Sequence, residues 1–230
     1  MKAGKHVLCE KPFAVNEKEV QSILDTAKKT GCFVMEALWT LYLPAVRKAL
    51  DWVQSGAIGD VRLITADFGD ELSTDPKGRI HNPELAGGAL LDVGIYPVLL
   101  SNAVTGLVPY CINANALFTK TGVDETTTMS LKYGEDTTAS LGASVAVKTK
   151  WNAVIYGNKG HIEIPEFFRA KEALLMAHDC EEFYMDTSEG LGYQHEAQAV
   201  TNLVAKGEKE SRIVSHDFSL DLIRTLDRIR

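Results

Sequence analysis

The sequence lacks both the positive charge of a nucleic-acid-binding protein and the long apolar runs of a membrane protein. Its 230 residues include 24 Lys and Arg against 31 Asp and Glu, a formal net charge of -7 at pH 7. Without an excess of cations to neutralise phosphates, we expect no nucleic acid or anionic membrane as a partner. No stretch approaches the roughly 18 to 20 continuous apolar residues of a membrane span. The basic start, MKAGKHVLCE, does not continue into the apolar segment of a signal peptide.

Cysteine is scarce as well. Cys9, Cys32, Cys111 and Cys180 are far apart and form no C-x-x-C pair. Scattered single cysteines in a chain without a secretion signal are typical of free thiols in a reducing compartment, and their spacing does not fit a zinc site. We therefore expect an acidic cytoplasmic protein with no metal centre, in which 45% apolar residues supply the core.

The first forty residues predict a β-strand, a helix and a second β-strand. A short apolar run over residues 6–9 is followed by Asn16 and Glu19, which form a capping box at the start of a helix. Apolar residues at positions 20, 23, 24 and 27 share one face of that helix, and Gly31 marks its end. A second apolar run covers residues 32–35. Two strands joined by one helix indicate a parallel pair, which normally needs further strands and helices around it.

The rest of the chain changes from helical to alternating patterns. Helices are predicted over 44–55 and 89–105, a strand over 61–68, and a long Gly-, Pro- and Asp-rich loop over 69–88. From residue 109 apolar and polar residues alternate, which indicates antiparallel hairpins that include 129–133, 139–147, 151–156 and 161–164. Two helices, 195–206 and 218–230, close the chain.

These elements predict an α/β plus α+β fold. Residues 1–40 are expected to be a remnant of a Rossmann-type parallel sheet. Residues 41–230 are expected to form an open-faced antiparallel β-sheet domain with helices on one face, and the final helix is free to pack back on the remnant.

Three polar residues are candidates for chemistry. Lys11 precedes a proline and therefore has extended backbone at the carboxyl end of its strand, where open α/β sheets bind ligands. Asp92 and Tyr96 are four residues apart on a predicted helix, so both point to the same side. The alternatives stay open at this point: Lys11 also fits a solvated loop, Asp92 a helix brace, and Tyr96 a core position.

Three motifs in order carry a family resemblance. CEKPFAVNEKEV, MEALWTLYLPAV and NPELAGGALLDVGIYPVLL, supported by VIYGNKGHIEI and GYQHEAQAV, resemble the Gfo/Idh/MocA oxidoreductases, in particular the dimeric dihydrodiol and NADP-dependent xylose dehydrogenase branch. The resemblance implies a Rossmann domain followed by an open-faced sheet. It also implies hydride transfer between NAD or NADP and a sugar, polyol or cyclic dihydrodiol, and a homodimer or higher oligomer formed through the open sheet face.

The resemblance also implies roles for individual residues. Lys11, Asp92 and Tyr96 take the catalytic positions, with Tyr96 as acid/base, Lys11 as its electrostatic partner and Asp92 as the group that orients the substrate. A tyrosine has a pKa of about 10, and we expect the nearby ammonium to lower it.

Further residues are assigned to the cofactor and substrate by the same resemblance. Glu10, Pro12 and Trp39 join Lys11 as cofactor-binding candidates. Phe68, Arg79 and His81 are weaker pocket candidates beside Trp39, and a loop histidine such as His81 is usually exposed.

The sequence departs from the family in two places. It contains no G-x-G-x-x-G string, and about eighty to ninety residues at the start of a full-length relative have no counterpart here. Leu41 replaces an arginine that commonly reaches the cofactor. Two other hypotheses therefore remain: a non-catalytic dimerisation or binding module, and a truncated remnant that does not fold alone or bind dinucleotide.

Overall fold

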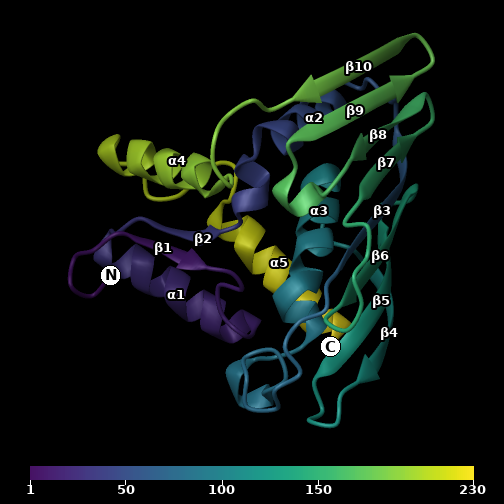
Figure 1. Ribbon diagram of the computed structural model, residues 1–230. Coiled ribbons are helices and arrows are strands. Elements are labelled where there is room, and N and C mark those ends of the chain that lie inside the picture. Colours follow the sequence, from purple (N-terminus) through teal and green to yellow (C-terminus); the bar gives the residue numbers. More distant parts are fainter.

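The N-terminal segment forms the expected βαβ unit. The computed structural model describes residues 1–230 (Figure 1) and begins with β1 (Val7–Glu10), α1 (Glu17–Thr30) and β2 (Val34–Ala37). The two strands pair in parallel, with Val7 opposite Val34. The Asn16 side chain accepts a hydrogen bond from the Glu19 amide at 2.9 Å, and Gly31 ends the helix with a φ of 65°. Both predicted boundaries of α1 are confirmed.

A second group of helices follows. After a 3-10 turn over Trp39–Tyr42 come α2 (Pro44–Gln54) and β3 (Val61–Gly69). The helix predicted over 89–105 begins instead with a π-helical turn, Leu90–Gly94, and only then becomes α3 (Ile95–Thr105). Pro97 lies just after this turn, and a proline ring inside a helix clashes with the carbonyl four residues earlier, here that of Val93.

The large sheet has eight strands in the order β10-β9-β8-β7-β3-β6-β5-β4. All neighbours are antiparallel except β3 and β6, which pair in parallel. The sheet is therefore mixed. Its strands besides β3 are β4 (Cys111–Phe118), β5 (Asp124–Tyr133), β6 (Thr137–Ser144), β7 (Ala153–Gly157), β8 (Gly160–Ile164), β9 (Glu172–Ala177) and β10 (Cys180–Met185).

Helices cover one face of this sheet (Figure 1). α2 packs on β8 and β9, and α3 packs on β3 and β6. The last helix, α5 (His216–Ile229), contacts α1, α3 and β4, so it lies between the βαβ unit and the sheet. α4 (Tyr193–Ala205) contacts the 3-10 turn that carries Trp39. The buried apolar side chains form one cluster that runs from the βαβ unit to the sheet.

One segment is apolar enough to resemble a membrane span, although the sequence analysis predicted none. The stretch Pro83–Thr105 has 23 residues, and its most apolar window has a mean hydropathy of 1.3 and few charges, so length and composition alone would let it cross a membrane. In the fold, 89% of its most apolar window is buried inside the protein. Packing of α3 between the sheet and α5 accounts for this apolarity.

Candidate active site

Lys11 lies at the carboxyl end of β1, next to a cis Lys11–Pro12 peptide bond. Its side chain is only 14% exposed. The ammonium donates to the main-chain carbonyl oxygen of Asp92 at 2.5 Å and lies 3.6 Å from the Asp92 carboxylate oxygen Oδ1. It also lies 4.9 Å from the centroid of the Tyr96 ring. The three residues chosen from the sequence therefore meet, although they come from segments more than eighty residues apart.

Asp92 has two cationic neighbours. It lies in the π-helical turn and is buried. Besides Lys11, the guanidinium of Arg79 donates to Asp92 Oδ1 and forms an ion pair with it. Arg79 comes from the long loop and remains largely exposed, which leaves its guanidinium accessible at the rim of the site. The carboxylate thus holds Lys11 from one side and the loop from the other.

The hydroxyl of Tyr96 does not meet the ammonium directly. Tyr96 stands in the first turn of α3 and is 7% exposed. Its oxygen accepts a hydrogen bond from the indole N–H of Trp39 at 3.2 Å, while Lys11 faces the ring. Trp39 is therefore a direct partner of the phenol.

We expected Lys11 to lower the pKa of Tyr96, and this prediction is wrong: the pKa is raised. Burial raises the pKa of Tyr96 above its ordinary value, and the hydrogen bond from Trp39 opposes this only in part. Burial also lowers the pKa of Lys11, although the charge of Asp92 works in the opposite direction. Desolvation penalises the charged form of both groups and is the largest effect on the pKa of each. The phenol is held in its protonated, proton-donating form.

Aromatic rings line the space beside Tyr96. Phe68 on β3 is stacked on Phe168 with centroids 4.0 Å apart and lies 5.3 Å from the Tyr96 ring. Tyr193, at the start of α4, is stacked on Trp39 at 4.3 Å. Phe68 and Trp39 were predicted from the sequence, whereas Phe168 and Tyr193 were not. The only local signal for them is the aromatic pair at 167–168 and the tyrosine of GYQHEAQAV.

The remaining predicted residues lie at different distances from this centre. Glu10 is exposed at the end of β1, and Pro12 is partly buried. His81 was expected to be exposed but is only 7% exposed, and its Nε2 atom has no hydrogen-bond partner. It makes no hydrogen bond or ion pair to Lys11.

Two buried acids were missed by the sequence reading. Glu36 on β2 accepts a hydrogen bond from the Phe13 amide at 2.9 Å, two residues after Lys11, while its Oε2 atom has no partner. Burial raises the pKa of Glu36 to about 7. Glu196 on α4 is buried in the same way, and burial raises its pKa to about 7. Glu36 braces the segment that carries Lys11.

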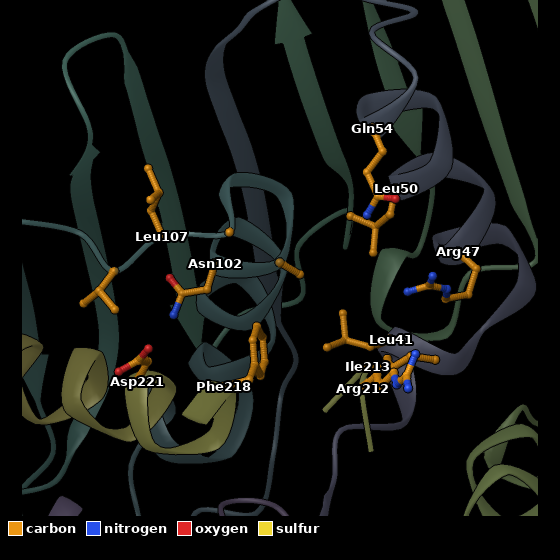
Figure 2. A pocket seen from close by; sticks show the side chains of 13 residues that line it. Leu41, Arg47, Leu50, Gln54, Asn102, Leu107, Arg212, Ile213, Phe218 and Asp221 are labelled. Carbon is orange, nitrogen blue, oxygen red and sulfur yellow. The ribbon is translucent and has the colours of Figure 1, made fainter. Parts of the chain in front are cut away.

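A separate cavity of about 350 Å³ lies on the helical side, between α2, α3 and α5 (Figure 2). Leu41 lines this cavity and is 1% exposed. Lys11, Asp92 and Tyr96 are not among its lining residues. The side chain of Leu41 therefore faces this cavity.

The cofactor candidates concern one end of a dinucleotide. Glu10, Lys11, Pro12 and Trp39 are the candidates for the nicotinamide end, and two of them, Lys11 and Trp39, contact Tyr96. Pyrophosphate binding requires a glycine-rich turn that opens a helix. Here β1 leads into α1 without one, and the first turn of α1 carries Glu17 and Glu19, whose charges repel an anion. This chain thus supplies candidates for the nicotinamide end only.

Comparison with known proteins agrees with this architecture. Residues 46–163 match the GFO/IDH/MocA C-terminal domain, and residues 1–38 match the oxidoreductase family with an NAD-binding Rossmann fold. The chain is 36% identical over 222 residues to trans-1,2-dihydrobenzene-1,2-diol dehydrogenase of Xenopus laevis. That alignment covers 92% of this chain and 66% of the relative, so the chain spans about two thirds of the relative's length.

Solved structures share the fold. An aldose-aldose oxidoreductase from Caulobacter crescentus, complexed with glycerol, superposes with a TM-score of 0.90 at 24% identity, covering 99% of this chain and 70% of that one. A 3-ketoreductase from Actinomadura kijaniata, in complex with NADP and TDP-benzene, gives 0.85 at 23% identity, covering 100% and 71%. Given the family match over residues 46–163 and the identity to the dihydrodiol dehydrogenase, this chain belongs to the Gfo/Idh/MocA family of NAD-binding oxidoreductases.

Proposed function

We propose that this chain carries the catalytic residues of an NAD(P)-dependent oxidoreductase that interconverts a CH–OH group and a carbonyl on a sugar, polyol or cyclic dihydrodiol. The observation that carries the proposal is the meeting of Lys11, Asp92 and Tyr96 in one buried site. The ammonium lies 4.9 Å from the centroid of the phenol ring and 3.6 Å from a carboxylate oxygen, so a cation, an anion and a proton donor share one buried site.

Tyr96 is the proposed proton donor in the reducing direction. When bound, the nicotinamide supplies or accepts the hydride at the substrate carbon. The carbonyl oxygen must gain a proton as its carbon gains the hydride, and the raised pKa of Tyr96 keeps that proton available. In the oxidising direction the phenolate form must take the alcohol proton, and burial opposes this direction.

Lys11 and Asp92 are the proposed orienting groups. Lys11 is held by the Asp92 carbonyl at 2.5 Å, so its remaining N–H bonds are available to a substrate oxygen. Asp92 is fixed by Lys11 and Arg79, and a hydroxyl next to the reacting carbon would donate to its carboxylate. Two neighbouring oxygens on the substrate would thus be bound together, as in a diol or a sugar.

The aromatic side chains favour a substrate with a flat or ring-shaped apolar face. Phe68, Phe168 and Trp39 offer ring faces and edges next to Tyr96. The relative is named for a dihydrobenzene diol and the structural neighbour for aldoses, and both names denote compounds that carry hydroxyl groups. The experiment below distinguishes these substrate classes by comparing turnover with a diol, a sugar and a polyol.

The experiment measures nicotinamide absorbance with NADP, NAD and nicotinamide mononucleotide, each paired with trans-1,2-dihydrobenzene-1,2-diol, D-xylose or glycerol. The mononucleotide tests the nicotinamide end alone. We expect turnover with at least one pair, and Tyr96→Phe lowers it by about 10² to 10⁴-fold. Tyr133→Phe, which changes another buried tyrosine, is the matched control and keeps the activity. Absence of turnover with every pair contradicts the proposal.

We also propose that the uncovered face of the large sheet joins two copies of the chain. A hollow of about 550 Å³ lies on this face, and its polar lining consists of Thr and Asn side chains, Ser130, Ser140 and one charged residue, Asp67. Small polar residues let two sheets approach closely and satisfy each other's hydrogen bonds. Light scattering is expected to show a dimer for the wild type. Ser130→Arg puts a positive charge in the hollow, and this variant is expected to be a monomer. A wild-type monomer contradicts this proposal.

A further inference from the structure

Pro97 occupies an unusual position relative to the candidate site. It is the third residue of α3, directly after Tyr96 and five residues after Asp92. The turn before it, Leu90–Gly94, is π-helical and contains Asp92. A proline inside a helix clashes with the carbonyl of the residue four positions earlier, here Val93, so Pro97 favours a wider turn at this point. π-Helical turns are rare in proteins and frequent at functional sites.

The π-helical turn also bears on which backbone amide faces the Asp92 carbonyl. In a π-helical register a carbonyl accepts from the amide five residues later, which for Asp92 is residue 97. Proline has no N–H, so that partner does not exist. A buried carbonyl without a partner is costly, and the ammonium of Lys11 fills the position with a hydrogen bond of 2.5 Å.

The main-chain contact is closer than the side-chain contact. Lys11 Nζ lies 2.5 Å from the carbonyl oxygen of Asp92 but 3.6 Å from its carboxylate oxygen Oδ1. The carboxylate is already engaged by Arg79. The direction in which Lys11 points is therefore set first by the backbone of the π-helical turn.

We propose that Pro97 is a positioning residue: by widening the turn and providing no competing N–H, it reserves the Asp92 carbonyl for the ammonium of Lys11. The catalytic meaning of this contact rests on the function proposed above. The contact itself does not, because it involves only groups of this chain and can be measured without cofactor or substrate.

Pro97→Ala restores an amide that can pair with the Asp92 carbonyl. Lys11 then loses its closest acceptor, and its ammonium form loses stabilisation. We expect the pKa of Lys11 to fall by about one unit. At a pH below this pKa, the fraction of Lys11 in the neutral amine form then rises about tenfold, and the rate of acetylation rises with it. The rate is measured against pH by mass spectrometry of the acetylated peptides, with the exposed Lys18 as internal reference.

Pro44→Ala is the matched control. Pro44 begins α2, so the substitution makes the same chemical change in the first turn of another helix. It is expected to leave the acetylation profile of Lys11 unchanged. An unchanged Lys11 profile in Pro97→Ala overturns the proposal, as does an equal shift in both variants.

A second measurement uses the wild-type chain, so the proposal stays testable if Pro97→Ala does not fold. In labelled protein, NMR detects scalar coupling across a hydrogen bond. We expect coupling between Lys11 Nζ and the carbonyl carbon of Asp92. The measurement is made at low temperature, where the ammonium protons exchange slowly, and absence of the coupling there overturns the proposal. Failure of the oxidoreductase assay would leave this coupling in place, so the two proposals fail separately.

Discussion

Replacing Glu36 with glutamine tests whether the burial of this acid makes the stability of the fold depend on pH. The Glu36 side chain is only 3% exposed, and one of its oxygens accepts the Phe13 amide hydrogen bond at 2.9 Å. The amide side chain of Glu36→Gln keeps an oxygen acceptor for that hydrogen bond but carries no charge at any pH. The substitution therefore removes ionisation with little change in shape.

The magnitude follows from the pKa of Glu36. Burial raises this pKa from 4.5 to about 7. Between these values the folded chain holds a proton that the unfolded chain has released, so the free energy of unfolding falls as the pH rises. A difference of about 2.5 units at 1.36 kcal/mol per unit corresponds to about 3 kcal/mol. Below about pH 4.5 both states are protonated, and Glu36 contributes no pH dependence.

The assay is urea unfolding, followed by circular dichroism, at several pH values from about 5 to 8. The variant and the wild type are expected to have similar stability at the lower end. At the upper end Glu36→Gln is more stable by up to about 3 kcal/mol. Glu135→Gln, which changes an exposed glutamate, controls for the loss of one carboxyl group. A stability difference between Glu36→Gln and wild type that does not vary with pH refutes the reasoning.

Two further substitutions test separate parts of the structure. Tyr133→Phe removes a hydroxyl that donates to Asn102 Oδ1 at 2.8 Å, and we expect urea unfolding to show a loss of about 1 to 2 kcal/mol; an unchanged midpoint would contradict the buried hydrogen bond. Asp92→Asn removes the carboxylate that stabilises the ammonium of Lys11, so the pKa of Lys11 should fall further. Acetylation of Lys11 against pH measures this, and a rise in its pKa would show that another anion holds the ammonium.

Local patterns predicted the N-terminal unit well because the signals are local. The Asn16 cap, the apolar face of α1 and Gly31 are all readable within fifteen residues, and each has its expected place in the fold. The same holds for α2, which begins at Pro44 as predicted. Capping and helical periodicity depend on neighbours in sequence, so tertiary contacts change them little.

The π-helical turn was not predicted, although its cause is visible in the sequence. The stretch 89–105 is apolar on all sides, so periodicity gives no register, and Pro97 is the one local signal of an irregular turn. β9 and β10 were also missed. β10 is largely exposed, so its residues show no alternation between buried and exposed positions.

The surroundings of Tyr96 depend on contacts that sequence spacing does not reveal. Phe168 and Tyr193 come from a turn and a helix about seventy and one hundred residues later, and no local pattern joins them to the phenol. Their packing, together with Trp39, contributes to the burial that raises the pKa of Tyr96. A sequence reading that counted only the charge of Lys11 therefore predicted the wrong direction.

The most direct test of the central claim follows the hydride. Reduced nicotinamide labelled with deuterium at C4 is incubated with the wild-type chain and a carbonyl compound derived from a diol or aldose, and mass spectrometry of the product locates the label. We predict deuterium on the former carbonyl carbon with the wild type, and at least about a hundredfold less with Tyr96→Phe. Equal labelling by both proteins, or none by the wild type, would contradict a redox site built on Lys11, Asp92 and Tyr96.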